Sequence, residues 1–359
     1  MLKTIEQLIK CKTVYPNYEE ITNCLHYIKA FFSDSGLYIN EYECKGDKSI
    51  VISNSSDKNL DIIFCGHIDV VPANDDLFKL RISEGRIYAR GAADMKSQVA
   101  VMMHLMLEAT KSHKKIALML TSDEERGGFN GTKYLLDERQ YSCKIAIVPD
   151  GGADFNLVTE EKGVLQIKLA YIGKEAHSAY LWKGENALLR LYSVYNCLIE
   201  KYPNPESNER WRTSVNLASV VCDNALNKVP KFAEMLLDIR HINSDKKEDI
   251  LKYINQIDSE VNIEVLAEGE SFFCDEKNVL VKDFIKRCEA VLGTKIEREY
   301  VPSSSDARFF SSKGVPCIIM NPKCGNLHMD DEWVDIASLR DLFKIYYGTV
   351  GTGSSVPLT

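Results

Sequence analysis

Five residues of the types that bind divalent metal ions are spaced along the chain: His67, Asp94, Glu125, Asp150 and His328. Four of them follow short apolar runs typical of β-strands, in DIIFCGHID, KIALMLTSDEE, KIAIVPD and PCIIMNPKCGNLH. The ligand crevice of an open α/β sheet lies at the carboxyl ends of its strands, so we expect these side chains to converge there. The set supplies the imidazoles and carboxylates that zinc accepts. The sequence therefore predicts a pair of zinc ions and hydrolytic chemistry.

Asp69 follows His67 by two residues, so on a strand both side chains point the same way. His67 can then bind a metal while Asp69 accepts a hydrogen bond from the second ring nitrogen, which fixes the tautomer. A His-x-Asp pair by itself more often has a purely structural role. Here the pair indicates a metal site because four other candidate ligands accompany it.

Two further segments carry carboxylates beside predicted strands and helices. Asp94 precedes a predicted helix, where an aspartate commonly caps the backbone N–H groups; a carboxylate there can also bridge two metals roughly 3.5 Å apart. Glu124 and Glu125 follow a strand and precede a Gly-rich loop. They could form a solvated acidic turn, or one could bind metal while its neighbour acts as general base.

The elements that must position these residues fall into two kinds of sequence pattern, one in the outer parts of the chain and one between them. To about Gly163 and again from about residue 269, helical periodicity alternates with short apolar runs, and the helix at 96–109 between two strands indicates a β-α-β unit. We expect an α/β fold with a mainly parallel sheet flanked by helices. The predicted helices are 2–9, 21–32, 96–109, 279–292 and 336–347, and the predicted strands are 61–64, 116–120, 145–148 and 317–320.

Between these parts, VLQIKLAYIG, TSVNLASVV and FAEMLLDIRHI alternate as half-exposed strands do, and NALLRLYSVYNCLIEKY and KKEDILKYINQI have helical periodicity. We expect an inserted α+β domain that acts as a lid and in dimer formation. The predicted organisation is a discontinuous catalytic domain (1–163 and 269–350), an inserted domain (164–268) and a flexible tail (351–359).

Composition excludes several classes of partner. The formal net charge of -8 argues against nucleic acid and anionic membranes, which require a basic face. The eleven cysteines include no C-x-x-C pair and indicate thiols of a reducing compartment. The N-terminal segment has neither a long apolar stretch nor a small-residue cleavage site, so we expect a cytoplasmic protein with no membrane partner.

The ordered motifs together resemble a zinc-dependent family of peptidases and deacylases. It includes acetylornithine deacetylase, succinyl-diaminopimelate desuccinylase, glutamate carboxypeptidase and bacterial dipeptidases. The resemblance runs from Thr13 to about Tyr347 and rests on GHIDVVP, GRIYARGAADMKS, TSDEERGGFNGTKYL, IVPDGG, GKEAHSA, LNKVP, DIRH, SSSDARFF and NLHMDDEWV.

Carried over residue by residue, the resemblance implies two zinc ions per chain, with cobalt or manganese as substitutes. It makes His67 and Asp150 the terminal ligands of one ion, Glu125 and His328 those of the other, and Asp94 the bridge. It also makes Glu124 the general base and Asp69 the residue that orients His67. A cis peptide bond between Asp94 and Met95 is implied as well.

The resemblance also implies substrate contacts. His177 matches a histidine that polarises the scissile carbonyl, commonly from the partner subunit, so a homodimer is expected. The positions that hold the substrate's carboxylate are matched by Arg240, Asn227, Ser304 and Ser305.

The expected function is hydrolysis of the amide bond of a small N-acyl amino acid, as in a deacetylase or desuccinylase, or of a short peptide with a free carboxylate. A dipeptidase or aminopeptidase on the same scaffold is the alternative. It is favoured by Asp150 in PDGG, where many deacylases carry glutamate. A third reading, a binding protein without catalysis, is opposed by the intact ligand set and Glu124.

Overall fold

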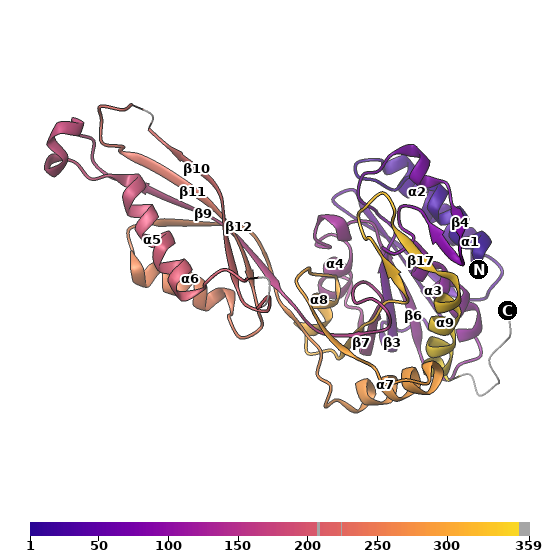
Figure 1. Cartoon of the computed structure of the whole chain (residues 1–359). Helices are drawn as coiled ribbons and strands as arrows, with labels where there is room; N and C mark the ends of the chain where they lie inside the picture. Colours follow the sequence, from indigo (N-terminus) through magenta and orange to yellow (C-terminus); the bar gives the residue numbers. More distant parts are fainter. Residues whose placement is uncertain (207–208, 224, 352–359) are drawn as a thin grey trace. The chain divides into compact units, whose positions relative to one another are not determined.

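The computed structural model describes residues 1–206, 209–223 and 225–351, and the predicted tail from 352 to 359 lies outside the described residues. The chain forms two compact units (Figure 1). Unit 1 comprises Met1–Thr159, Cys274–Glu299 and the chain from Ser305 onward. Unit 2 comprises Glu160–Phe273 and Tyr300–Ser304.

The main sheet contains strands in the order β1-β2-β6-β3-β7-β15-β8-β13, with β14 also paired to β8. Strands β6, β3, β7 and β15 are parallel neighbours, whereas the pairs further out are antiparallel. The α/β prediction is confirmed, with a mixed sheet whose middle is parallel. The strands are β1 (Tyr38–Cys44), β2 (Asp47–Ser53), β3 (Asn59–His67), β6 (Ile116–Thr121), β7 (Ser142–Val148), β8 (Leu157–Glu161), β13 (Phe272–Phe273), β14 (Arg298–Val301) and β15 (Cys317–Ile319).

The middle strands are apolar because both of their faces are covered. Every residue of β6 is buried, as are the last six residues of β3. Strands buried on both faces have continuous apolar sequences rather than alternating ones. This explains why their positions could be predicted from short apolar runs.

Helices cover the sheet on both sides (Figure 1). Helix α3 contacts β3, β6, α1 and α9, and α7 contacts α9; α4 and α8 lie on the other side of the strands. Helix α3 is buried along most of its length and begins two residues after Asp94. The helices are α1 (Leu2–Lys10), α2 (Tyr18–Phe31), α3 (Lys96–Ala109), α4 (Thr132–Asp137), α7 (Val279–Leu292), α8 (Ala307–Ser311) and α9 (Ile336–Val350), with short 3-10 turns η1 (Asp75–Phe78) and η2 (Glu124–Arg126).

A small antiparallel sheet in unit 1 joins two distant parts of the sequence. Its order is β16-β17-β5-β4, with Trp333 of β17 opposite Tyr88 of β5. This sheet fixes the segment that leads to Asp94 beside the segment that follows His328. The strands are β4 (Arg81–Ser83), β5 (Arg86–Tyr88), β16 (Cys324–Gly325) and β17 (Trp333–Asp335).

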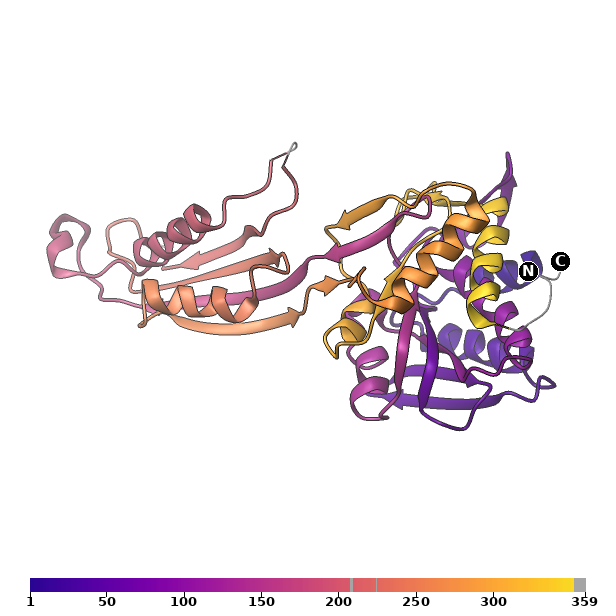
Figure 2. The same cartoon turned by 90° about the horizontal axis from the view of Figure 1, so that it is seen from below.

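Unit 2 is a four-stranded antiparallel sheet in the order β10-β11-β9-β12, with two helices on one face (Figure 2). Buried and partly exposed residues alternate strictly along most of β9 and β11, and the buried side packs against α5 and α6. The elements are β9 (Gly163–Ile172), η3 (Ser178–Lys183), α5 (Ala187–Lys201), β10 (Ser214–Cys222), β11 (Phe232–His241), α6 (Lys247–Ile257) and β12 (Asn262–Gly269).

Within the described part of the chain, the helices are all too short or too polar to span a lipid bilayer.

Candidate metal centre and active site

The parallel strands bring the predicted ligands to one edge of the main sheet. His67 is the last residue of β3, and Glu125 and Asp150 follow β6 and β7 within a few residues. Because β3 is parallel to both β6 and β7, their carboxyl ends coincide. His328 differs from the expectation: it lies in the loop between β16 and β17 rather than at the end of the strand β15. The small sheet, not the main one, therefore delivers this imidazole.

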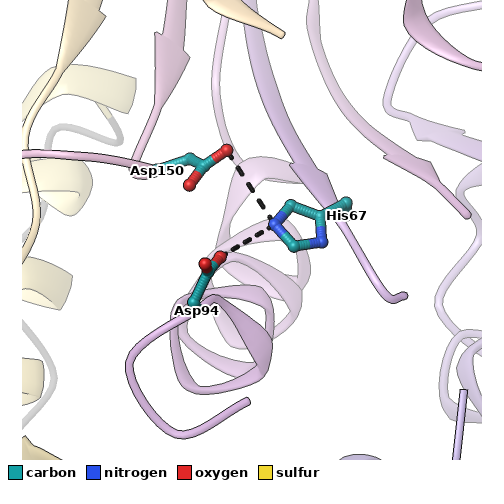
Figure 3. Close-up of side chains that lie close together, drawn as sticks. All are labelled: His67, Asp94 and Asp150. Atoms are coloured by element: carbon teal, nitrogen blue, oxygen red, sulfur yellow. Dashed lines mark hydrogen bonds and ion pairs between the residues drawn. The ribbon is translucent and has the colours of Figure 1, made fainter. Parts of the chain in front are cut away.

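The first group of ligands consists of His67, Asp94 and Asp150 (Figure 3). His67 Nε2 lies 3.0 Å from Asp94 Oδ1 and 3.8 Å from Asp150 Oδ2. The imidazole is 1% exposed, so its orientation is fixed by packing. One nitrogen thus faces two carboxylates from different elements, as in a site for a cation.

The second group consists of Asp94, Glu125 and His328. His328 Nε2 lies 3.1 Å from Asp94 Oδ2 and 3.4 Å from Glu125 Oε1. Asp94 therefore presents a different carboxylate oxygen to each imidazole. In each group the candidate ligand atoms lie within 4.8 Å of one another. A carboxylate in this position can bridge two ions. The peptide bond between Asp94 and Met95 is cis.

The second ring nitrogen of His67 is also engaged, though not as predicted. Its Nδ1 pairs with the backbone carbonyl of Asp69 at 2.9 Å, whereas the carboxylate oxygen Oδ1 of Asp69 lies 3.5 Å away. The other carboxylate oxygen accepts the backbone N–H of Glu125 at 3.0 Å. A carbonyl can only accept, so Nδ1 carries a hydrogen and Nε2 is the nitrogen that could offer a lone pair to a bound cation. Asp69 thus contacts both ligand loops.

The electrostatics of the cluster favour added positive charge. Burial would lower the pKa of His67, but Asp69 and Asp94 raise it well above its ordinary value. The hydrogen bond with Asp94, followed by the nearby carboxylate of Glu125, raises the pKa of His328 to about 10. Burial opposes ionisation of Asp94, yet its hydrogen bonds with the two imidazoles hold its pKa well below the usual range. A potential that retains protons so strongly also attracts divalent cations.

The donor set fits two metal ions. Each group offers one imidazole nitrogen and two carboxylates, which are ligands that zinc accepts. Glu125 Oε1 is buried and makes no well-aligned hydrogen bond to the described residues, although His328 Nε2 lies 3.4 Å away; a buried polar atom of this kind calls for an explanation. A cation between Glu125, His328 and Asp94 would satisfy this oxygen.

Glu124 lies beside the ligands without a competing partner. Its side chain is partly buried and makes no hydrogen bond to any described residue. Burial, and then the charge of Asp150, raise its pKa well above the ordinary value for glutamate. The carboxylate is therefore suited to hold a proton during a reaction.

The remaining predicted residues lie mostly in unit 2, in two separate places. His177 is exposed after the end of β9, and the N–H of its neighbour Ser178 donates to the carbonyl of Asn227 at 2.9 Å. Arg240 lies near the carboxyl end of β11, at the opposite end of the sheet from His177, and its Nε donates to Asp238 at 2.9 Å. It lines a cavity of about 370 Å³. Ser304 belongs to unit 2, whereas Ser305 is a buried residue of unit 1.

Two buried charged residues beside the ligands were not identified from the sequence. Arg90 and Glu332 form an ion pair next to Asp94, with a separation of 2.5 Å. Glu332 comes four residues after His328, directly before β17. The sequence offered one signal for Glu332: it is an acidic residue that directly precedes a short strand.

Comparisons with known proteins identify the family of this chain. The profile of the peptidase family M20/M25/M40 matches residues 63–352, and the chain belongs to this family. It is a hydrolase. The chain is 30% identical to a succinyl-diaminopimelate desuccinylase from Helicobacter pylori (strain HPAG1) over 317 residues, which cover 82% of this chain and 80% of that protein.

Solved structures share the fold. Aminopeptidase PepT from Bacillus cereus superposes with a TM-score of 0.77 and 19% identity, covering 98% of this chain and 97% of that one. A dinuclear metal binding peptidase of the M20 family from Bacillus subtilis gives a TM-score of 0.72 and 11% identity, covering 97% and 96%.

Proposed function

We propose that this chain is a di-zinc enzyme that hydrolyses the amide bond of a small N-acyl amino acid bearing a free carboxylate. The N-succinyl group is the preferred acyl group in this proposal, because the similar Helicobacter pylori protein is named a desuccinylase. Unit 1 is assigned to catalysis and unit 2 to substrate enclosure and dimer formation.

The observation that carries the proposal is the pair of ligand groups that share Asp94, with Glu124 beside them. A bridging carboxylate brings two cations close enough to act on one substrate. A binding protein without catalysis would have no use for a partly buried glutamate beside the ligand groups whose side chain makes no hydrogen bond to the described residues.

The chain's own residues then divide the work of hydrolysis. Two bound ions supply Lewis acidity to a water molecule and to the scissile carbonyl. Glu124 accepts the proton of the attacking water and passes it to the departing amine nitrogen. The imidazole of His177 donates a hydrogen bond to the carbonyl oxygen as negative charge develops there. Arg240 pairs with the free carboxylate, for which the planar guanidinium is suited.

His177 and Arg240 of one chain cannot act on the same small substrate. Arg240 is opposite Val164 near the start of β9, whereas the ladder ends at Ile172 and His177 lies beyond it. Eight residues of extended strand span roughly 26 Å. The backbone pairing continues outward through His177 and Lys228, so this segment does not fold back toward Arg240. The separation supports a site that takes His177 from a partner subunit.

An exposed apolar surface surrounds this end of unit 2. It includes the end of β9, the 3-10 turn η3 and the end of the edge strand β10, with Trp182 77% exposed. Exposed apolar residues at a sheet edge favour pairing with another chain. We assign the surface to a second copy of this chain in a symmetric dimer. Its exposed members include Ile172, Tyr180, Leu181, Trp182 and Val221.

A dipeptidase or aminopeptidase is the second candidate. Asp150 is one methylene shorter than the glutamate found at this position in many deacylases, and it lies at 3.8 Å from His67 Nε2. The shorter acid is typical of relatives that cleave peptides. This candidate differs from the first in the substrate, not in the chemistry.

A substrate panel in the presence of zinc tests the proposal. N-succinyl and N-acetyl amino acids, dipeptides and tripeptides are compared at equal concentration, with a chelator-treated sample as the control. We expect the highest kcat/KM for an N-succinyl amino acid and loss of turnover in chelator. Preference for peptides would select the second candidate. Full activity without bound metal would exclude both.

A further inference from the structure

Glu332 is a buried carboxylate that the proposed mechanism does not use. Its side chain is 1% exposed, although it lies in the segment between His328 and β17 on a chain with many solvated acids. Burying a carboxylate costs several kcal/mol unless hydrogen bonds and an opposite charge compensate it. The contacts of Glu332 show what compensates this one.

The carboxylate of Glu332 accepts hydrogen bonds from the turn that carries Asp94. Its Oε1 accepts the backbone N–H groups of Ala93 at 2.8 Å and Asp94 at 3.1 Å, and its Oε2 accepts the N–H of Gly91 at 3.2 Å. Three backbone donors from the four-residue stretch 91–94 thus bind one side chain. The position of the Asp94 backbone depends directly on Glu332.

Arg90 completes the arrangement by reaching the other ligand loop. Its Nη1 donates to Glu332 Oε2 at 2.5 Å, and its Nη2 donates to the backbone carbonyl of His328 at 3.1 Å. Arg90 is 2% exposed. The guanidinium therefore ties the loop of His328 to the turn of Asp94, which is more than 230 residues away in sequence.

Main-chain pairing places Arg90 and Glu332 close enough to form their ion pair. Strands β5 and β17 are antiparallel neighbours, and the N–H of Ala89 donates to the carbonyl of Glu332 at 3.3 Å, one step beyond the ladder. Arg90 and Glu332 thus emerge side by side at the same end of the small sheet. The chain leaves this end toward Asp94 on one strand and toward His328 on the other.

We propose that Glu332 and Arg90 are positioning residues that set the location of the bridging carboxylate and of His328 before metal binds. The inference rests on the proposed two-metal centre. Asp94 serves both ligand groups, so a displaced turn would weaken both. His328 serves only one group, so loosening its loop alone would weaken only that ion.

The alternative is an ion pair that stabilises the fold without affecting the ligands. The two roles differ in what a change of charge does at constant shape. In Glu332→Gln an amide NH₂ replaces one carboxylate oxygen, so donors of the turn or of Arg90 face another donor. A structural role predicts lower stability with unchanged metal affinity, whereas a positioning role predicts weaker binding in protein that is still folded.

The test measures zinc affinity by competition with a chromophoric chelator, with folding checked by circular dichroism. We expect Glu332→Gln to lower the zinc affinity of both sites by about 10- to 100-fold, the usual effect of losing a residue that holds a metal ligand. Asp331→Asn is the matched control, because it makes the same charge change at the adjacent exposed position, where the carboxylate accepts a hydrogen bond from Asn326. It should leave both affinities unchanged.

Arg90→Lys is the second variant and decides the matter if Glu332→Gln does not fold. Lysine keeps the charge opposite Glu332 but lacks the two separate donor nitrogens with which Arg90 binds Glu332 and the His328 carbonyl together. We expect the zinc affinity of the His67 and Asp150 site to stay unchanged and that of the Glu125 and His328 site to fall. Unchanged affinity for both ions in a folded Arg90→Lys protein, or in a folded Glu332→Gln protein, would overturn the proposal.

The proposed function can fail separately from this inference. If the unmodified protein bound no zinc, the two-metal centre itself would be wrong, and the positioning role would fall with it. If the unmodified protein bound two ions and hydrolysed its substrate while both variants bound zinc normally, only the positioning role would be wrong.

Discussion

Asp94 is the residue on which the centre depends most. Its two oxygens face His67 and His328 at 3.0 and 3.1 Å, so one side chain defines the relation between both ligand groups. The other four candidate ligands each belong to a single group. Substitution of Asp94 should therefore differ from substitution of any of the others, because both ions would be affected at once.

Glu124 and Glu125 are adjacent but have different proposed tasks, which mutation can separate. We expect Glu124→Gln to keep both ions and to lower kcat by about 10²- to 10⁴-fold, because a general base contributes that much. Glu125→Gln should lose affinity for one ion as well as activity. Metal content and single-turnover rates measured on the same samples distinguish the two effects.

The isosteric change also serves as its own folding control. An amide has nearly the volume of a carboxylate, and the Glu124 side chain makes no hydrogen bond to the described residues, so stability should change little. Turnover within twofold of the unmodified enzyme in Glu124→Gln would show that the base lies elsewhere.

The sequence predicted which candidate ligand residues lie together, but not the residues that hold them in place. His67, Glu125 and Asp150 follow apolar runs, and this places them at one sheet edge by a general rule. Arg90 and Glu332 follow no such rule, because their pairing depends on a two-strand contact between segments far apart in sequence. The hydrogen bond of His67 Nδ1 to a backbone carbonyl also requires coordinates, since both acceptors of Asp69 lie within reach.

Among the elements, helix α3 supports the site from beneath the Asp94 turn. It is buried along most of its length, and His104 on it is packed against two other helices. The His104 ring meets the ring of Phe31 edge-on at 5.3 Å, and Nε2 lies 2.9 Å from the hydroxyl of Thr4. Protonating this imidazole would place a charge in a poorly solvated contact.

The burial of His104 predicts a dependence of stability on pH. Burial lowers its pKa in the folded protein to about 4, below the unfolded value near 6.5. Between these values the unfolded chain binds more protons, so stability is complete above about pH 6.5 and declines as pH falls toward 4. Replacement by glutamine should remove on the order of 1 kcal/mol of this decline, a value reduced because the ring is partly exposed.

Urea unfolding at several pH values between 7 and 4, with chelator present throughout, measures this difference without interference from the metal centre. The exposed His26→Gln is the matched control on α2. Parallel pH curves for His104→Gln and the unmodified protein would show that His104 does not contribute to acid sensitivity.

The elements that the sequence predicted well are those with one dominant pattern. Helices α3 and α7 have the predicted bounds, because their apolar faces pack continuously in unit 1. Strand β12 was missed: it is an edge strand with a bulge between Val265 and Ala267, and most of its residues are exposed. An edge strand of this kind has no periodic burial that its sequence could reveal.

At the scale of the whole molecule, the proposed dimer follows from the arrangement within unit 2. Arg240 and His177 lie at opposite ends of one sheet, so if both contact the substrate as proposed, a single copy of that unit cannot supply both contacts. Sequence similarity implied the shared histidine. The strand register supplies a physical reason for it.

Subunit mixing tests this arrangement. His177→Ala and Glu124→Gln should each be inactive, yet a heterodimer contains one site with both groups intact. Random exchange of two-fold dimers should therefore restore about a quarter of the unmodified activity. Native mass spectrometry verifies that exchange has occurred.

A double variant that carries His177→Ala and Glu124→Gln on the same chain provides the control. Mixing it with the single variant His177→Ala creates no intact site. Absence of recovery after verified exchange, or an active enzyme that is monomeric at assay concentration, would contradict the shared site.

The pairing of β8 with β13 has a further consequence for how such an enzyme can change over time. Glu161 and Phe272 are direct partners across these strands, so the long segment Glu160–Phe273 of unit 2 begins and ends at the same point of the ladder. An insertion with adjoining ends can lengthen, shorten or be exchanged without shifting the strand register that aligns the ligands. If unit 2 sets the substrate preference as proposed, that preference can evolve through changes in this inserted segment, while the candidate metal ligands and Glu124 in unit 1 keep their positions.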